Sequence, residues 1–377
     1  MGPPGREDGV VSTMLKFLRG EILLLQAVPV ALIAYLFEHA VMEAGQAFAL
    51  VAAAALIVSI ATASMRVAHH AEILAAKAGE PYGTMILTLS AVLVEVLILV
   101  IMMQQTQQPT LVRDTIYSAV MLDINGILGL AALLGGLKHG EQSYNDDSGR
   151  TYSVMILTAM GISMIVPDFV PKESWHYYSA FTIVAMLALY AVFLKMQVGQ
   201  HSYFFSYRYP KMRQGAEQSA ADEEEHGPTA LSVGVILVGV ALIGLLAEFM
   251  SAFLTDGLEG TGAPLALTAI LVAAIAAGPE ILTALRAALK NRMQAVVNIA
   301  LGASLSTVIL TVPVVEAIAL FTGQPFTMAM TPVQITMVAI TLVAAAINVS
   351  DGETNAIEGM THFVLFATFI MLSFLGL

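Results

Sequence analysis

Long apolar segments follow one another along the chain, with short breaks at Gly, Pro and charged residues. A helix needs roughly 20 apolar residues to cross the ~30 Å hydrocarbon core of a bilayer. Window hydropathy predicts eleven such helices, at residues 21–37, 46–66, 84–103, 115–137, 153–170, 177–197, 229–252, 264–289, 293–320, 331–349 and 359–376. Strands of a membrane barrel would be ~10 residues long and would alternate apolar with polar positions. The pattern therefore predicts an all-α polytopic membrane protein.

Composition agrees with a membrane location. Hydrophobic residues make up 58% of the chain, charged residues only 12%, and the mean hydropathy is +0.80. The absence of cysteine excludes disulfides, thiolate metal sites and thiol catalysis. Part of the net charge of -12 comes from the acidic cluster Asp222–Glu225. The bilayer is an expected partner, and nucleic acid is not.

The distribution of Lys and Arg predicts the orientation, because loops on the cytoplasmic side carry more of them. With the N-terminus in the cytoplasm, residues 1–20 form a cytoplasmic lead-in and the C-terminus lies outside. The inside segments then hold Arg6, Lys16, Arg19, Arg66, Lys77, Lys138, Arg150, Lys195, Arg208, Lys211, Arg213, Arg286, Lys290 and Arg292, against only Arg113 and Lys172 outside. The expected location is the cell inner (plasma) membrane.

A polar stretch at residues 198–228 divides the chain and is expected to be a cytoplasmic acidic linker. A shift of about 185 residues places helices two to six on helices seven to eleven. The segments 46–197 and 229–377 are therefore predicted to be five-helix repeats, with 21–37 as an extra helix. Because five is odd, the second repeat is inverted, a construction that places a binding site near the bilayer midplane.

The same shift superimposes two carboxylates, Glu95 and Glu280. Glu95 lies in the middle of an apolar run with no basic partner, where a charge costs roughly 2.5–3.5 kcal/mol. Glu280 follows Gly278–Pro279, a pair that is expected to break the helix in mid-membrane and free carbonyl oxygens. The simpler interpretation of Glu95 is a protonated glutamate bonded to a neighbouring helix. The simpler interpretation of Glu280 is a residue beside a proline kink that is needed only for packing. Two carboxylates at equivalent places favour a transport site.

Two carboxylates with a few neutral oxygens suit a hard cation such as calcium, which takes 6–8 oxygen ligands. The same carboxylates can instead be neutralised by protons, and burial favours that uncharged form. Protons and cation would compete for one site, and the empty site with two negative charges would meet a desolvation barrier to crossing. This chemistry predicts obligatory exchange of calcium for protons.

Neutral oxygens near the two glutamates are candidate cation ligands. They are Thr88, Ser90, Asn125, Ser304 and Ser306, and Asn298 and Thr307 lie on the same helix as the last two. Each hydroxyl has an alternative role, a bond to a carbonyl in the preceding helical turn. Glu248 and Asp123 are candidates for an ion pathway, although an interfacial glutamate in water is an equally good interpretation of Glu248. His69 and His70 are interpreted as part of a cytoplasmic extension.

Three stretches resemble known signatures. Gly79–Thr84 with Leu87–Ser90 and Glu95-Val96 is similar to the first signature of the bacterial ChaA-type branch of the calcium/cation antiporter superfamily, the CAX-like exchangers. The second signature is matched by Pro279-Glu280, Arg286–Ala288, Lys290-Asn291, Gly302 and Leu305–Pro313, and the C-terminal loop of microbial and plant relatives by Ser350–Gly359. The resemblance implies two inverted five-helix repeats, calcium/proton exchange, and Glu95 and Glu280 as cation ligands.

Two departures from the signatures bear on the ion. Val92 stands where family members often carry a polar residue, and Ala91-Val92 and Ala276-Ala277 stand where many carry Gly-Asn. Because ChaA-type relatives are also associated with sodium and potassium, exchange of one of these ions for protons is the alternative.

Other classes of protein fit less well. The chain has no His-Glu-x-x-His, Gly-x-Ser-x-Gly or P-loop motif, so an enzyme or an ATP-driven pump is not expected, and no cofactor is expected. A cation channel would build rings of carboxylates from several subunits, whereas an internal inverted pair favours a carrier. The sequence leaves open whether the protein forms a homo-oligomer.

Overall fold

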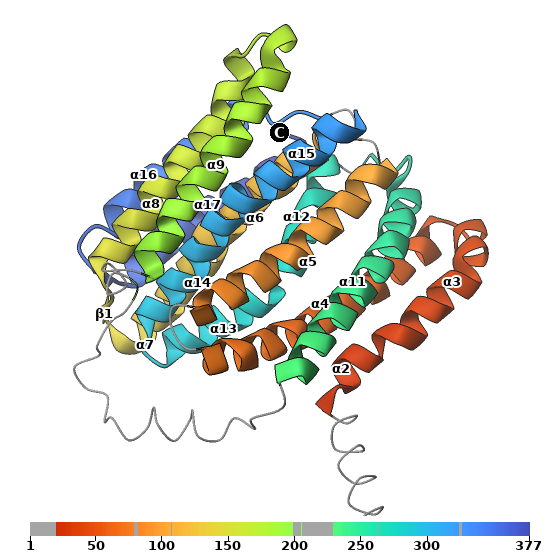
Figure 1. Cartoon of the computed structure of the whole chain (residues 1–377), viewed down its shortest axis with the longest axis horizontal. Coiled ribbons are helices and arrows are strands. Elements are labelled where there is room, and N and C mark those ends of the chain that lie inside the picture. Colours follow the sequence, from red (N-terminus) through yellow and green to blue (C-terminus); the bar gives the residue numbers. More distant parts are fainter. Residues whose placement is uncertain are drawn as a thin grey trace, which may run out of the picture.

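The structure is a computed structural model that describes residues 20–78, 82–106, 108–198, 205, 229–262, 264–323 and 326–377. These residues form a bundle of long helices that lie side by side (Figure 1). In chain order the helices of the first part are α2 (Ile22–Leu25), α3 (Ala27–Glu43), α4 (Gln46–Ala78), α5 (Tyr82–Thr106), α6 (Leu111–Met121), η1 (Leu122–Leu128), α7 (Gly129–His139), α8 (Asp146–Met160), η2 (Gly161–Ile165), η3 (Val166–Phe169), η4 (Lys172–Ser174) and α9 (Trp175–Val198). Those of the second part are α11 (Thr229–Leu258), α12 (Leu265–Ala276), α13 (Gly278–Leu289), α14 (Met293–Ser306), η6 (Thr307–Thr311), α15 (Val312–Thr322), α16 (Pro332–Asn348) and α17 (Ala356–Phe374).

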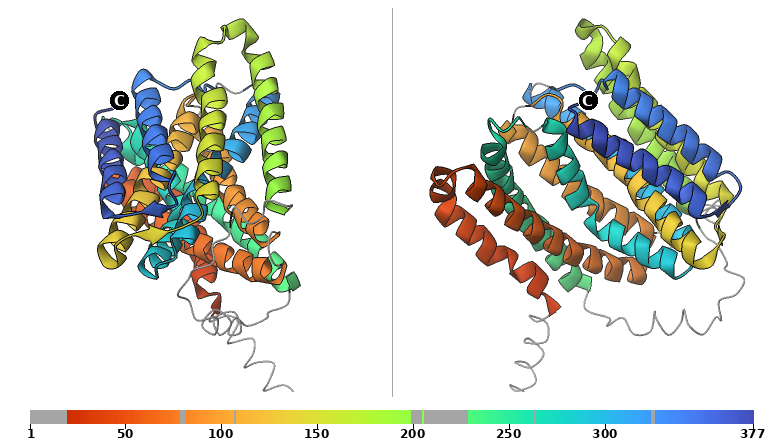
Figure 2. Two further views of the ribbon diagram at one scale, coloured as in Figure 1. Left: turned by 90° about the vertical axis from the view of Figure 1, so that its left-hand side faces the viewer. Right: turned by 180° about the vertical axis from the view of Figure 1, so that it is seen from behind.

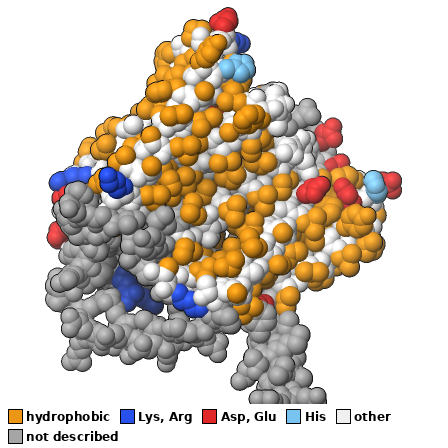
Figure 3. Space-filling model, in the orientation of Figure 1, with side chains coloured by type: hydrophobic (Ala, Val, Ile, Leu, Met, Phe, Trp, Pro, Cys, Tyr) orange, Lys and Arg blue, Asp and Glu red, His pale blue; other side chains and the backbone are white. Residues whose placement is uncertain are grey.

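The predicted fold class is confirmed. Among the described residues, nine helices are long and apolar enough to cross a membrane, and the bent pair α12–α13 makes a tenth candidate span. The expected span at 331–349 is α16, an apolar helix of 17 residues. Hydrophobic side chains cover most of the described surface in Figure 3, as a surface in contact with lipid requires. The segment 1–19 and most of the linker 198–228 lie outside the described residues.

Segments that the orientation places on one side of the membrane lie at one end of the bundle. Lys138 Nζ donates to the carbonyl of Leu289 at 2.8 Å. At the same end the strand β1 (Gln142–Ser143) pairs antiparallel with β2 (Glu353–Thr354). At the other end, Thr327 N–H donates to the carbonyl of Pro109 at 2.9 Å. The helix order therefore agrees with the predicted grouping of loops, while the identity of the cytoplasmic end stays a prediction.

The second helix is longer than predicted, because α4 continues to Ala78 instead of ending at residue 66. Arg66 does not end the helix at a water interface, since its guanidinium Nε donates to Glu21 Oε2 at 3.2 Å. Glu21 is buried, and its Oε1 lies 3.0 Å from His70 Nε2. His70 Nδ1 in turn lies 3.2 Å from Ser232 Oγ on α11. His70 lies on the part of α4 that extends past the predicted end, and its contacts join the extra N-terminal helix to both halves of the chain.

Arg66→Ala is expected to destabilise the protein by about 3–5 kcal/mol, because it leaves the Glu21 carboxylate buried without its cationic partner. The measurement is thermal unfolding of the purified protein in detergent. The control is Arg150→Ala, since Arg150 pairs with Asp146 across an exposed surface, where such a pair contributes about 0–1 kcal/mol. Equal loss of stability in both variants would contradict the role assigned to Glu21 and Arg66.

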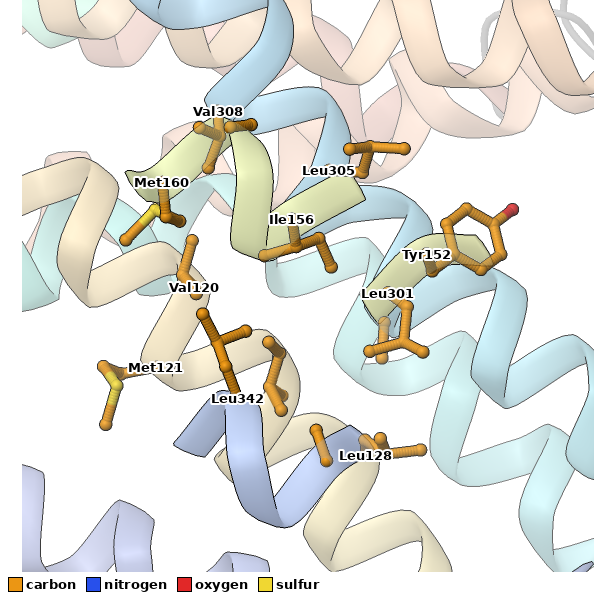
Figure 4. Packing of buried hydrophobic residues seen from close by; sticks show 14 of the residues in the cluster. Val120, Met121, Leu128, Tyr152, Ile156, Met160, Leu301, Leu305, Val308 and Leu342 are labelled. Atoms are coloured by element: carbon orange, nitrogen blue, oxygen red, sulfur yellow. The ribbon is translucent and has the colours of Figure 1, made fainter. Parts of the chain in front are cut away.

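Buried hydrophobic residues form two separate cores. One core lies among α2–α5, α11 and the apolar part of α12. The other lies among α6–α9 and α13–α17, and Met103 of α5 also belongs to it. Figure 4 shows part of this second core, where Val120 and Leu128 meet Leu301, Val308 and Leu342 from distant parts of the sequence. Figure 2 shows the helices of the first core grouped on one flank of the bundle. Each core thus combines elements from both predicted repeats.

Glycine allows α7 and α17 to pack against each other at short range. A methyl group added at Gly359 would lie 2.1 Å from the Leu133 backbone nitrogen, and one added at Gly129 would lie 2.8 Å from His362 Cβ. Small residues at such crossings allow the backbones of membrane helices to approach closely. This close packing places the start of α17 beside η1 and α7.

Gly359→Val is expected to lower stability by about 1–3 kcal/mol or more, because rigid backbone atoms block the added side chain. Thermal unfolding and the yield of monodisperse protein report the effect. Gly234→Ala is the matched control, because a methyl group there meets nothing within 4 Å. A Gly359→Val variant as stable as the Gly234→Ala variant would show that α7 and α17 do not pack this closely.

Candidate functional site

The chain bends by 60° between α12 and α13, at the expected Gly278–Pro279 break. In a continuous helix the N–H of residue 279 would bond the carbonyl of Ile275, but proline has no N–H. The break makes Glu280 an acidic residue in the first turn of α13, where the helix dipole favours negative charge. Its Oε2 is buried and has no hydrogen-bond partner among the described residues. The predicted break is therefore confirmed, and it presents a carboxylate inside the bundle.

Glu95 projects from α5 into the interior, with only 7% of its surface exposed. Its Oε2 accepts a hydrogen bond of 2.9 Å from Thr307 Oγ1 on η6. Its Oε1 is buried and has no hydrogen-bond partner in the described part of the chain. Glu95 and Glu280 are also close enough to interact electrostatically. The two predicted carboxylates are thus brought together, and each keeps one oxygen for a further ligand.

A third carboxylate, Asp123 on η1, belongs to the same group. It is 2% exposed, its Oδ2 accepts a hydrogen bond of 3.2 Å from Ser304 Oγ, and it interacts electrostatically with Glu95 and Glu280. Within the described ranges, no Lys, Arg or His forms an ion pair with any of the three. The group therefore concentrates acidic side chains without fixed positive charge, and protons or mobile cations must supply the compensation.

Some predicted ligands lie elsewhere or are already engaged. Asn125 is fully buried, but its Nδ2 donates to Thr341 Oγ1 at 2.7 Å and its Oδ1 lies 2.9 Å from His362 Nδ1. On η1 its side chain therefore contacts α16 and α17, and both ends of the amide are occupied. Ser306 Oγ donates to the carbonyl of Gly302 at 2.7 Å, the alternative expected for a helical serine.

The remaining predicted residues lack contacts with the carboxylates. Thr88 and Ser90 are partly buried on α5, and neither forms a hydrogen bond with Glu95 among the described contacts. Glu248 is exposed on α11, and no hydrogen bond or ion pair in the described part of the chain joins it to the group. A role for these three residues in the pathway stays a prediction without a supporting contact.

The predicted ligand set omitted two residues that the structure places in the interior. Thr307 was one of several hydroxyls after Glu280, and only the packing of η6 on α5 selects it as the partner of Glu95. Glu316 on α15 is 2% exposed, with Oε1 3.5 Å from Ser179 Oγ and Oε2 without a partner among the described residues. The sequence already indicated Glu316, because this glutamate lies in an apolar run without a basic residue, as Glu95 does.

The arrangement suits a mobile cation more than a resident metal. Among the residues that the structure places, no three His, Asp or Glu side chains surround a common point as metal ligands. Oxygen is the only ligand type present, from carboxylates and the hydroxyls of Thr307 and Ser304. Oxygen ligands favour hard cations, and a site with incomplete coordination can release its ion.

Known proteins with similar sequences are membrane transporters. The chain is 34% identical over 327 residues to "Sodium-potassium/proton antiporter ChaA" of Escherichia coli, covering 84% of this chain and 87% of the relative. It is 32% identical over 311 residues to "Putative ionic transporter y4hA" of Sinorhizobium fredii, covering 81% and 83%. It is 23% identical over 270 residues to "Ca(2+)/H(+) antiporter ChaA" of Bacillus subtilis, covering 70% and 74%.

Solved structures share the fold. "Structure of native YfkE" matches with a TM-score of 0.72 at 17% identity, covering 94% of this chain and 99% of that one. "Crystal Structure of H+/Ca2+ Exchanger CAX" matches with a TM-score of 0.65 at 14% identity, covering 94% and 89%. The family model described as "Sodium/calcium exchanger protein" matches residues 47–199 and 231–375. The resemblance seen in the signatures is confirmed: this chain belongs to the sodium/calcium exchanger family, and it is a multi-pass membrane transporter and not an enzyme.

Proposed function

We propose that this chain, as a cation/proton antiporter of its family, exchanges calcium for protons at Glu95 and Glu280, with Asp123 as a third carboxylate of the same site. The observation that carries the proposal is the unpaired state of the group. Glu95 and Glu280 each keep a buried oxygen without a hydrogen-bond partner among the described residues, and no ion pair reaches either. Such a group is costly in a membrane unless it binds protons or a cation.

Competition between the two ligands explains coupling. Calcium bound by Glu95 and Glu280 offsets the charge of these two carboxylates, and two protons on the same carboxylates do so as well. The unloaded site carries several negative charges that repel one another in a poorly solvated interior. The loaded forms therefore cross between the two faces more readily than the unloaded form. Exchange of one ligand for the other is the consequence.

The two hydrophobic cores suggest what moves. Glu95 is carried by α5 in one core, whereas Thr307, Asp123 and Ser304 belong to helices of the other. The Thr307–Glu95 hydrogen bond thus joins a helix of the first core to a helix of the second. A relative displacement of the helices of the two cores would break that bond and open the site to one face. Packed cores that move as units are the common basis of alternating access.

Exchange of sodium or potassium for protons is the second candidate. It is favoured by the 34% identity to a relative named a sodium-potassium/proton antiporter, and by the lack of a three-carboxylate metal cage in the described residues. A cation channel is less favoured, because the acidic group is assembled within one chain instead of around a pore between subunits.

The substrate is tested by cation-induced proton movement in everted vesicles or proteoliposomes, with calcium, sodium and potassium added separately at several pH values. Collapse of a pH gradient by calcium supports the proposal. Collapse by sodium or potassium alone would keep the site and overturn the calcium assignment. A conductive current without saturation would overturn the carrier mechanism itself.

We further propose a plasma-membrane location with the N-terminus in the cytoplasm and the C-terminus outside. The support is the grouping of the Lys- and Arg-rich loops at one end of the bundle, together with the bacterial relatives. Labelling of single cysteines tests it, because the natural chain has none. A cysteine at Glu141 is expected to react only from the cytoplasmic side, and one at Glu173 only from outside.

A further inference from the structure

An unpaired carboxylate lies inside the bundle but outside the group at the cation site. It belongs to Glu316 on α15, which is 2% exposed. Its Oε1 lies 3.5 Å from Ser179 Oγ on α9, and its Oε2 is buried without a hydrogen-bond partner among the described residues. Helices α9 and α15 lie side by side in Figure 1, so Glu316 faces a neighbouring helix and not lipid.

Glu316 lies between the cation site and the end of the bundle opposite the β1 and β2 strands. Helix α15 ends near that face at Thr322, and α9 begins there at Trp175. Thr307, the partner of Glu95, precedes Glu316 by nine residues on the same span, which corresponds to roughly 10–13 Å along the axis. The predicted orientation makes the nearer face the outer one.

Glu316 has no fixed positive charge beside it. Within the described ranges, no Lys, Arg or His forms an ion pair with its carboxylate. The elements packed against α15 are α9, η6 and α5. Of their titratable groups, Tyr178 on α9 interacts electrostatically with Glu316, α5 contributes Glu95, and η6 contributes none. The other titratable residues of α9 are His176, Tyr177, Tyr190 and Lys195. A carboxylate in such surroundings is costly unless it is neutralised.

A proton fits this place better than a metal cation. A hard cation such as calcium needs 6–8 oxygen ligands. Around Glu316 the structure supplies its own two oxygens and the Ser179 hydroxyl, whereas the Tyr178 hydroxyl donates to the carbonyl of Ile162 at 2.7 Å. No three metal-ligating side chains gather around one point in the described part of the chain. A proton needs a single oxygen, and Oε2 of Glu316 is available for it.

An unsatisfied hydroxyl lies between Glu316 and Thr307 along the span. Thr311, the last residue of η6, is fully buried, and its Oγ1 has no hydrogen-bond partner among the residues that the structure places. A helical threonine commonly bonds the carbonyl four residues earlier, as Thr322 does with Ile318. The Thr311 hydroxyl lacks that bond, and a hydroxyl both donates and accepts, as a proton relay requires.

We propose that Glu316 is a second proton-binding residue, which takes up protons from the face at which α15 ends and passes them toward Glu95 through the Thr311 hydroxyl and intervening water. In the uptake step a hydronium ion and the Glu316 carboxylate become water and a carboxyl group, and release is the reverse. Only O–H bonds form and break, so charge and atoms balance. The inference rests on proton exchange in the proposed function, but not on which cation is exchanged.

Infrared difference spectra of the purified protein at high and low pH test proton binding without requiring exchange. Glu316→Gln is expected to remove the carbonyl stretch of one protonated carboxyl group. The matched control is Glu43→Gln, the same change at an exposed glutamate at the end of α3. The band lost in Glu316→Gln should lie at higher frequency than that lost in the control, because a weakly hydrogen-bonded carbonyl stretches at higher frequency than a hydrated one. A pH difference spectrum unchanged by Glu316→Gln would overturn the inference.

Exchange in oriented membrane vesicles tests the route. The pH of the medium acts on the face at which α15 ends in right-side-out vesicles, under the predicted orientation, and on the opposite face in everted vesicles. Glu316→Gln is expected to slow exchange about tenfold or more, and to remove the response to medium pH in one vesicle type only. Glu316→Asp keeps a carboxyl group and should recover part of the rate. Cation affinity of the purified variants should stay within about twofold of the parent.

Thr311→Val removes only the hydroxyl and is expected to slow exchange in the same vesicle type as Glu316→Gln. Parent-like rates in either variant, an equal loss in Glu43→Gln, or a loss of pH response in both vesicle types would overturn the inference. A fall in cation affinity that accounts for the slower exchange would do so as well, because it would place Glu316 in the cation site. If the parent exchanges no cation, the proposed function fails, while the infrared band still decides whether Glu316 binds a proton.

Discussion

Glu95→Gln and Glu280→Gln are each expected to abolish cation-driven proton movement while leaving the protein folded. Glutamine keeps the size of the side chain and, at Glu95, can still accept the hydrogen bond from Thr307. It removes the charge that binds the cation and the group that binds the proton. Loss of one partner of a buried charge interaction costs about 2–5 kcal/mol, which corresponds to a fall of about 30-fold or more in affinity. Dequenching of a pH dye in proteoliposomes measures the loss.

Glu43→Gln is the matched control for these two variants. It makes the same chemical change at the end of another transmembrane helix, α3, where the side chain is exposed. Activity close to that of the parent is expected. Parent-like exchange in Glu95→Gln or Glu280→Gln, or an equal loss in Glu43→Gln, would mean that the transport site lies elsewhere.

Asp123→Asn is expected to weaken cation binding about tenfold or more and to change the number of protons exchanged per cation. The reason is electrostatic: Asp123 shares a poorly solvated region with Glu95 and Glu280, so its charge raises the local attraction for a cation. The amide can still accept the bond from Ser304, which limits the structural disturbance. Isothermal titration of the purified protein gives the affinity, and the reversal potential of exchange gives the stoichiometry.

Ser306→Ala separates this effect from general sensitivity of the region. Ser306 lies two residues from Ser304, but its hydroxyl bonds only the carbonyl of Gly302. Its loss is expected to change affinity by less than about twofold. An unchanged affinity and an unchanged stoichiometry in Asp123→Asn would remove Asp123 from the site and leave a two-carboxylate centre.

Local sequence patterns were enough to predict the main architecture. Long apolar runs have only one stable arrangement in a bilayer, so the helices and their order followed from hydropathy. Glu95 and Glu280 were found because a carboxylate in such a run is costly without a function. The break before Glu280 followed from the missing N–H of Pro279, and the structure bends there by 60°.

Features that depend on helix rotation and packing were not accessible in the same way. Asn125 and Asp123 are two residues apart, yet on η1 one contacts α17 and the other Ser304 on α14. Hydropathy does not show which face of a helix meets which neighbour, so Asn125 was predicted as a ligand and Thr307 was passed over. The end of α4 was misplaced for a related reason, because the partner of Arg66 is distant in sequence.

Some interior groups were missed although the criterion used for Glu95 applies to them. Glu316 and His362 lie in apolar helices, and both are buried with one side-chain atom unpartnered among the described residues. What the sequence lacks is their surroundings: His362 contacts Asn125, and Glu316 lies beside Ser179, each distant in sequence. Burial and hydrogen-bond satisfaction therefore add to composition in finding such groups.

The central claim is that cation and protons compete for the same buried carboxylates, and proton release on cation binding tests it most directly. Purified parent protein in weakly buffered detergent solution is mixed with calcium, sodium or potassium while a pH indicator records the proton count. Release of protons by the transported cation, growing as the starting pH falls and absent in the Glu95→Gln, Glu280→Gln double variant, is the expected result. Cation binding to the parent without any proton release would contradict the shared site.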